Sequence, residues 1–359
     1  MSPHLSIYLD FVRVLATLVV FVGHAKIFYR PLYEFCEIHN PGRDAVIVFF
    51  VLSGYVISWC AATREKTLDA YVVNRAARIY SVAIPAIVLG MLVSVLLWWQ
   101  FSEPLHYAMK KPWLYVPVYL SFLGESWTLS ETPPHQFPYW SIDYEVFYYV
   151  IFASWWYVRG MLGLGLAAFF ALIAGPKIVA MFPLWVLGSL IFFWGQRRAP
   201  PRIWAWVLFL GSIAFFLAIK VFELDARLDA WDRTVLADLI PMVLADPILG
   251  DWLIGATFAL NIVGVLGLRI PWGSSAQRVV QWSASHSFSI YLFHWPLFIL
   301  LSKFYTENDS FIGLVQMLVV SLVFIYALSY VSERRKGAYR NFFKALIGGL
   351  GRLPVKFRS

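Results

Sequence analysis

Charged residues are scarce in this sequence. Asp, Glu, Lys and Arg make up 14% of the 359 residues, whereas a soluble globular domain carries about a quarter. Hydrophobic residues make up 60%, and the mean hydropathy is +0.67. A chain this apolar lacks the polar surface that water requires, so we expect lipid to be its solvent. The composition argues against an ordinary soluble enzyme and predicts a polytopic membrane protein.

Cysteine is also scarce, and no cleavable leader is expected. Cys36 and Cys60 flank the second apolar segment and are expected near opposite membrane faces, so we expect no disulfide between them. The first apolar stretch, 7–29, is longer than the hydrophobic region of a signal peptide. We find no internal repeat, and we expect one transmembrane domain over 1–332 and a basic tail over 333–359 on the membrane surface.

Ten apolar runs approach the ~20 helical residues that cross a bilayer, and together they predict an all-α bundle of about ten transmembrane helices. The run at 160–175 is the weakest, and the 12-residue run at 112–123, with two prolines, is expected to be interfacial or re-entrant. The ten runs are 7–29, 43–62, 79–100, 139–158, 160–175, 178–195, 203–222, 252–270, 285–303 and 310–331.

Positive charge indicates the orientation. With both termini inside and ten crossings, 18 of the 29 Lys and Arg residues face the cytoplasm, which agrees with the positive-inside rule. The net charge of +8 therefore indicates membrane topology and does not indicate nucleic acid as a partner. Two hydrophilic pieces, 100–138 and 223–251, are expected outside, where they either cover a binding site or are ordinary loops. The acids of the second piece are Asp225, Asp229, Asp232, Asp238, Asp246 and Asp251.

Polar side chains inside the predicted spans are the candidate functional residues, because burying them in lipid is costly. On the first span, Asp10, Arg13 and His24 share one helical stripe with Thr17. Arg13 and His24 are 11 residues, or about 16 Å, apart along a helix. Ser53 and Gly54 on the second span permit close approach of either a ligand or another helix.

Three further groups of candidates have both a functional and a structural interpretation. Arg75 and Arg78 suit phosphate, although plain positive-inside charge explains them equally well. A carboxylate of the fourth span either orients a histidine or is an interfacial acid. The polar stripe of the ninth span either lines a pore or bonds a neighbouring helix. The residues of the last two groups are Trp140, Ser141, Asp143 and Glu145, and then Ser287, Tyr291 and His294.

Five stretches in order resemble acyltransferase family 3 of integral membrane proteins, which includes bacterial O-acetyltransferases of surface glycans. The resemblance covers most of the chain. Its residues are Arg13 and His24, the FFVLSGY stretch at 49–55, Arg75 and Arg78, Trp140, Ser141 and Glu145, and then Ser287, Tyr291, Leu292 and His294.

The resemblance implies an acyl-CoA donor, a hydroxyl of a carbohydrate or lipid-linked glycan as acceptor, and a multi-pass position in a bacterial cytoplasmic (inner) membrane. Acetyl is the commonest acyl group in the family, and succinyl is a variant. Neither a permanently bound cofactor nor a metal is expected. Arg13, Arg75, Arg78, Ser53 and Gly54 are then expected to bind the donor. Asp10, Trp140, Ser141, Tyr291 and His294 are expected to line the path.

A sugar hydroxyl is a poor nucleophile at pH 7, so the main chemical requirement of such a reaction is a general base. Of the three histidines within predicted spans, His24, His286 and His294, only His24 lies on a charged stripe at the level of a helical carboxylate. We therefore expect His24 to be the base, oriented by Glu145 or Asp143. Direct transfer and a covalent acyl-enzyme both remain open, as does the oligomeric state.

Two other function classes compete with an enzyme. A transporter or channel would use a histidine-lined path but would show inverted repeats with broken helices in matching halves, which we do not find. A membrane scaffold gives no reason for His24 to share a stripe with Arg13. Transfer or slow hydrolysis of labelled acetyl-CoA separates the enzyme from both.

The predicted topology places residues 63–78 and the tail from Glu333 inside, and residues 101–138 and 223–251 outside. In a chain whose two cysteines are replaced, a cysteine introduced at Arg64 should react only with a permeant thiol reagent. One introduced at Glu125 should also react with an impermeant reagent added to intact cells. Labelling of both positions from the same side would contradict the topology.

Overall fold

The computed structural model describes residues 1–235, 248–305 and 310–349, and these ranges are helical without a strand. The predicted all-α class is therefore confirmed. The chain forms two compact units. Unit 1 comprises Met1–Ala16, Arg43–Glu65 and Ala171–Ala284, and unit 2 comprises Thr17–Gly42, Lys66–Phe170 and Ser285–Ser359. Asp238, Asp246 and tail residues 350–359 lie outside the described residues.

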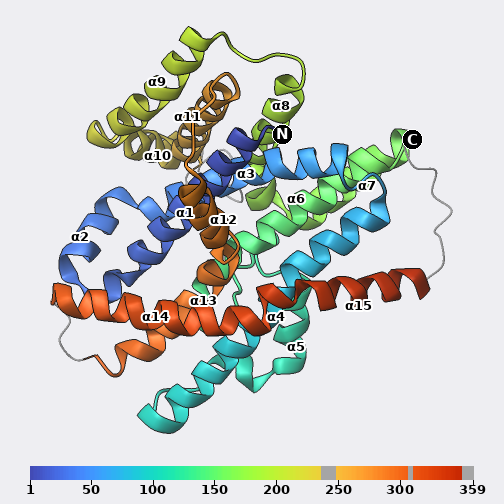
Figure 1. Ribbon diagram of the computed structural model, residues 1–359. Coiled ribbons are helices and arrows are strands. Elements are labelled where there is room, and N and C mark those ends of the chain that lie inside the picture. Colours follow the sequence, from blue (N-terminus) through green and yellow to red (C-terminus); the bar gives the residue numbers. More distant parts are fainter. Residues whose placement is uncertain (236–247, 306–309, 350–359) are drawn as a thin grey trace. The chain divides into compact units, whose positions relative to one another are not determined.

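Unit 1 is a helical cluster in which α9, α10 and α11 pack against one another and α11 also packs on α8 (Figure 1). Helix α1, Pro3–His24, begins in this unit and ends in unit 2, whereas α7, Gly160–Ala174, runs from unit 2 into unit 1. The other helices of unit 1 are α3 Pro41–Thr63, α8 Pro176–Gly195, α9 Arg202–Val221, α10 Leu224–Val235, α11 Leu249–Leu266 and α12 Ser274–Ala284.

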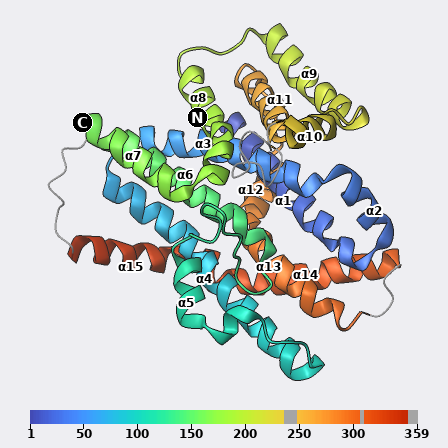
Figure 2. The ribbon, with the colours of Figure 1, turned by 180° about the vertical axis from the view of Figure 1, so that it is seen from behind.

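Unit 2 is built on the long helix α4, which α6, α13 and α15 contact (Figure 2). Its α-helices are α2 Arg30–His39, α4 Leu68–Phe101, α5 Pro112–Leu120, α6 Trp140–Tyr157, α13 Ser287–Ser302, α14 Phe311–Val331 and α15 Lys336–Gly349. Its 3-10 turns are η1 Ala25–Phe28, η2 Tyr107–Lys110, η3 Phe137–Tyr139 and η4 Glu333–Arg335.

Every one of the ten predicted apolar runs falls on a helix. Among the described residues, seven helices are individually long and apolar enough to cross a membrane, and the pair α12–α13 makes an eighth if it is one span. Helix α7 is apolar but only 15 residues long. Helix α5, over the run that we expected not to cross, has nine residues and is too short to span.

Helix α4 corrects the predicted third span. It begins at Leu68, 11 residues before the expected start, because the Thr67 side chain accepts a hydrogen bond from the backbone of Ala70 and caps the helix. Its 34 residues are about 51 Å long, well above the ~30 Å of the hydrocarbon core. Arg75 and Arg78 therefore lie within the helix and not at its mouth.

Helices α3 and α8 of unit 1 approach each other closely at glycines. A Cβ atom at Gly54 would lie 1.8 Å from the carbonyl oxygen of Trp185, and one at Gly188 would lie 1.9 Å from that of Val51. Beside them, the Trp185 indole donates to Ser53 Oγ at 3.2 Å. Small residues at such a crossing allow the backbone contact that drives helix association in membranes.

Two groups of charged side chains in unit 1 are paired across helices, which lowers the cost of placing them in apolar helices. Arg43 of α3 donates to both carboxylate oxygens of Asp251 on α11, at 2.7 to 3.0 Å. Lys220 of α9 bridges Asp44 of α3 and Asp225 of α10, at 2.6 and 2.5 Å. Four helices of the unit are thereby joined through charge pairs.

Gly54→Ala should destabilise the fold, because the new methyl group would force α3 and α8 apart. Overpacking of this kind costs about 1–3 kcal/mol. We expect a lower apparent melting temperature in detergent. Gly211→Ala on α9 is the matched control, because a Cβ there meets nothing within 4 Å. Equal melting temperatures for the two variants would contradict the packing described.

Candidate active site

Two histidines of unit 2 are hydrogen-bonded. His24 is the last residue of α1, and its Nδ1 lies 2.8 Å from Nε2 of His294 in the middle of α13. The two rings are stacked with their centroids 5.1 Å apart and their planes 16° from parallel. His294 is fully buried, whereas His24 is half-buried. Both were expected to matter, but their contact was not predicted.

The direction of this hydrogen bond follows from the second contact of His294. Its Nδ1 lies 2.9 Å from the carbonyl oxygen of Ile290, which only accepts, so Nδ1 carries the proton. With both rings neutral, His294 Nε2 accepts the Nδ1–H of His24. The proton-free nitrogen of His24 is then Nε2. The pair therefore leaves one imidazole nitrogen as a base with its tautomer set by the partner.

Aromatic rings and one glycine surround His24. Phe137 and Trp295 contact the ring edge to face, with centroids 5.9 and 5.1 Å away. A Cβ atom at Gly42 would lie 3.8 Å from His24 Nε2. Since glycine has none, the side of the ring that carries the free nitrogen faces a position without a side chain. The sequence did not indicate these neighbours. Phe137 and Gly42 lie outside the motifs, and Trp295 follows His294 without a spacing that predicts contact with His24.

The expected orienting carboxylates have contacts elsewhere. The Tyr149 hydroxyl donates to Glu145 one turn earlier on α6, and Asp143 accepts the backbone N–H of Glu125 at 3.1 Å. The ring contacts of His24 are with His294 and the aromatic residues, so the structure does not bring either acid to His24. The sequence placed an acid at the level of His24, but depth along a helix leaves the facing direction open. The hydrogen-bond partner of the His24 ring is a second imidazole, that of His294.

The path residues Ser141 and Tyr291 are brought together. Their hydroxyl oxygens are 2.6 Å apart and join α6 to α13, one turn before His294. The Tyr291 ring lies 6.5 Å from that of His294. Trp140 contacts Tyr144 on its own helix, with centroids 5.2 Å apart. Ser141 and Tyr291 thus belong to the surroundings of the histidine pair.

Arg75 and Arg78 lie on α4 in the same unit. Arg75 is half-buried over the rings of Tyr71 and Tyr149, each 5.9 Å from its guanidinium carbon. Arg78 is exposed and lies 5.8 Å from the Phe288 ring at the start of α13. Close by, Glu333 accepts hydrogen bonds from the backbone and hydroxyl of Ser289, a contact that the sequence did not indicate.

The remaining candidates belong to unit 1. Arg13 donates to Asp10 one turn earlier at 2.9 Å. Ser53 and Gly54 contact α8. Of the two interpretations of these small residues, close approach of another helix therefore agrees with the contacts shown. Within residues 1–235, 248–305 and 310–349, no group of three or more His, Cys, Asp or Glu side chains is arranged to hold a metal ion.

Comparison with known proteins points to one kind of chemistry. The profile of a family described as Acyltransferase domain matches residues 6–332. The chain is 26% identical over 278 residues to the exopolysaccharide production protein ExoZ of Rhizobium meliloti (strain 1021), which covers 66% of this chain and 82% of that protein. No solved structure matches the chain.

The proton positions of the histidine pair can be measured. In protein with ¹⁵N-labelled histidine, we expect the shift of a protonated nitrogen at His24 Nδ1 and of an unprotonated nitrogen at Nε2. Replacing His294 by Leu removes the acceptor, so the two tautomers of His24 should then mix. His24→Gln assigns the signals. A protonated Nε2 in the unmodified protein would contradict the hydrogen-bond direction.

Proposed function

This chain belongs to the acyltransferase family that its residues 6–332 match, and on that premise we propose that it transfers an acyl group from acyl-CoA to a glycan hydroxyl. The observation that carries the proposal is the His24–His294 pair, which leaves a free ring nitrogen beside a position with no side chain. The resemblance to an exopolysaccharide production protein supports a polysaccharide or a lipid-linked precursor as acceptor. Acetyl is the proposed acyl group.

The proposed chemistry is general base catalysis by His24. Nε2 of His24 removes the proton of the acceptor hydroxyl as the oxygen attacks the thioester carbonyl carbon. The carbon–sulfur bond of the resulting tetrahedral intermediate then breaks, and the coenzyme A thiolate takes the proton from His24. His294 is a positioning residue, because it accepts from Nδ1 and supports the charge that His24 carries between the two steps.

Arg78 and Arg75 are the proposed contacts of the donor phosphates. Arg78 is exposed near the beginning of α4, and guanidinium groups bind phosphate through paired hydrogen bonds. The loop that carries Phe137 contacts α4 farther along, where Gln136 donates to the Ala86 carbonyl at 2.6 Å. Ala86 lies eight residues, or roughly 12 Å of helix, beyond Arg78, and the segment that contacts Ala86 also carries Phe137 to His24. An extended pantetheine arm is suited to this separation.

The contacts of unit 2 are consistent with the proposed N-in, C-in topology. Arg78 and Glu333, both expected inside, lie near Phe288 and Ser289 at one end of α13. Glu103 and Lys303, both expected outside, form an ion pair at its other end. We propose that the donor phosphates bind at the cytoplasmic end and that the glycan binds at the opposite one, in a bacterial inner membrane.

Replacing the base should abolish transfer while sparing donor binding. We expect His24→Ala and His24→Gln to lower the rate of transfer from labelled acetyl-CoA by about 10²- to 10⁴-fold, the usual contribution of a general base. Donor affinity is measured on the same samples. His39→Gln, the same change at a half-buried histidine of α2, is the control and should keep its rate. Near-normal transfer by both His24 variants would make this histidine structural.

Replacing the donor contact should instead weaken acyl-CoA binding. A hydrogen bond to a charged group contributes about 1.5–3 kcal/mol, so Arg78→Ala should raise the dissociation constant of acetyl-CoA by roughly ten- to a hundredfold. Arg159→Ala, which removes an exposed charge just after α6, controls for general charge and should bind normally. Unchanged affinity in Arg75→Ala, Arg78→Ala and the double variant would refute the assignment.

A further inference from the structure

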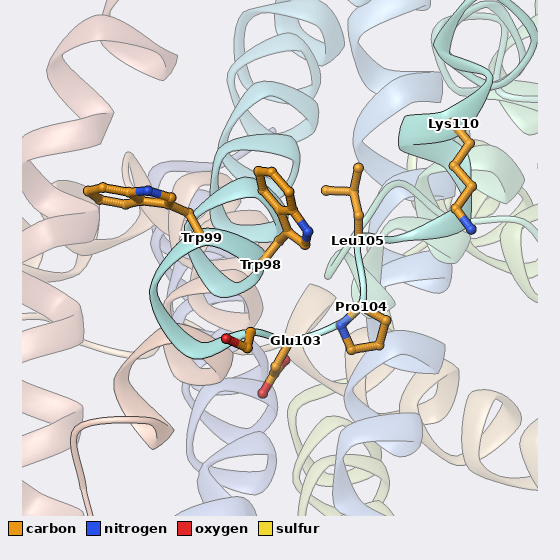
Figure 3. A pocket seen from close by; sticks show the side chains of 7 residues that line it. Trp98, Trp99, Glu103, Pro104, Leu105 and Lys110 are labelled. Atoms are coloured by element: carbon orange, nitrogen blue, oxygen red, sulfur yellow. The ribbon is translucent and has the colours of Figure 1, made fainter.

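A pocket of about 560 Å³ lies where α4 ends in unit 2. Figure 3 shows Trp98 and Lys110 on either side of Leu105, with Glu103 and Pro104 below them. The chain turns here because Ser102 adopts a left-handed conformation, with φ of 55°, directly after the last helical residue. The lining residues are Trp98, Trp99, Ser102, Glu103, Pro104, Leu105 and Lys110.

We propose that this pocket binds a sugar ring of the acceptor glycan, an inference that rests on the proposed glycan acyltransferase function. The volume lies within the roughly 300–1,000 Å³ of small-molecule sites. Trp98 and Trp99 offer exposed indole surfaces, and the C–H faces of a pyranose stack on the negative face of such rings. Glu103, Lys110 and Ser102 offer hydrogen-bond acceptors and donors to its hydroxyl groups.

Side chains of both charge signs line the pocket, with Glu103 and Lys110 among them. Glu103 contributes a carboxylate, and the ion pair with Lys303 holds it at the end of α13. Burial lowers the pKa of His106 and of His135 beside it, so both imidazoles are neutral at pH 7 and add no positive charge. Sugar hydroxyls both donate and accept hydrogen bonds, so they suit the carboxylate of Glu103 and the ammonium group of Lys110. The phospholipid readout of the test distinguishes a sugar from a lipid headgroup.

The pocket is connected to the histidine pair by two routes in unit 2. Lys303 caps the end of α13, about 13 Å of helix beyond His294. The backbone of Pro134 packs on α4 at Gly90, where an added Cβ would lie 2.0 Å from its oxygen, and the same loop carries Phe137 to His24. A sugar held at the pocket is therefore within a few sugar units of His24.

The position of the pocket along α4 also fits an acceptor. Trp98 follows Arg78 by 20 residues, or about 30 Å of helix, which is the thickness of the hydrocarbon core. The proposed donor phosphates and the pocket therefore lie at opposite ends of one helix. The segment that carries Pro134 and Gln136 packs on α4 at residues 86 and 90, between Arg78 and Trp98. The same segment carries Phe137, which contacts His24 of the histidine pair.

The test is a binding titration without donor. The probe is the surface polysaccharide of the source organism, deacylated with mild alkali and cut to oligosaccharides. It is titrated against the full chain in lipid nanodiscs. We expect Trp98→Ala to weaken binding about tenfold or more. Trp282→Ala on α12 is the matched control, since both indoles are 53% exposed and only Trp98 lines the pocket. Glu103→Gln should also weaken binding.

Four results would overturn the inference: no binding by the unmodified protein, unchanged binding by Trp98→Ala, equal weakening by Trp282→Ala, or loss of bound phospholipid in place of sugar binding. Hydrolysis of labelled acetyl-CoA without acceptor is measured on the same samples. Donor hydrolysis without sugar binding overturns the pocket assignment alone. Sugar binding that depends on Trp98, without acetyl-CoA hydrolysis or transfer, supports the pocket and overturns the proposed donor chemistry.

Discussion

The hydrogen bond from His24 to His294 holds the end of α1 against the middle of α13, and the rest of the candidate site is arranged around it. His294 in turn donates to the carbonyl of Ile290 on its own helix, so a backbone group sets the tautomer of both rings. This arrangement lowers the free-energy cost of burial in an apolar environment, because two neutral imidazoles form a hydrogen bond with each other without a buried net charge. A carboxylate partner would have brought a charge into the same space.

Helix α4 links the proposed donor contacts, the histidine pair and the proposed acceptor pocket. Its length exceeds the hydrocarbon core, so it carries Arg75 and Arg78 near one end and Trp98 near the other. The helices α6, α13 and α15 and the loop around Gln136 all contact it. Pro85 lies inside α4 between Arg78 and Trp98, so residue number sets the separation of these two residues only along the helix path. The proposed donor contacts, base and acceptor pocket follow one another in this order. In the proposed mechanism the acyl group travels the length of its carrier arm.

Several polar groups in the described apolar helices are matched by groups on neighbouring helices. In unit 1, Arg43 and Lys220 bind aspartates on neighbouring helices. In unit 2, hydroxyl groups such as those of Ser141 and Tyr291 bond across helices. The same requirement explains why some of the polar residues in the predicted spans have structural contacts. Ser53 and Gly54 are polar or small because α8 packs against them, and Asp143 holds the loop at Glu125.

The all-helical class and the positions of the apolar helices could be predicted from the sequence, and His24, Arg78 and His294 were among the candidate residues that it indicated. The length of an apolar segment and the polar residues within it are local properties, so both can be identified directly from the sequence. Only the tertiary structure decided that His294, and neither Glu145 nor Asp143, is the partner of His24, because residues at one depth on different helices face any direction until the helices pack. The structure likewise shows that α4 begins at Leu68, where Thr67 caps it, and that Trp98 and Lys110 line one pocket, because the chain turns at Ser102.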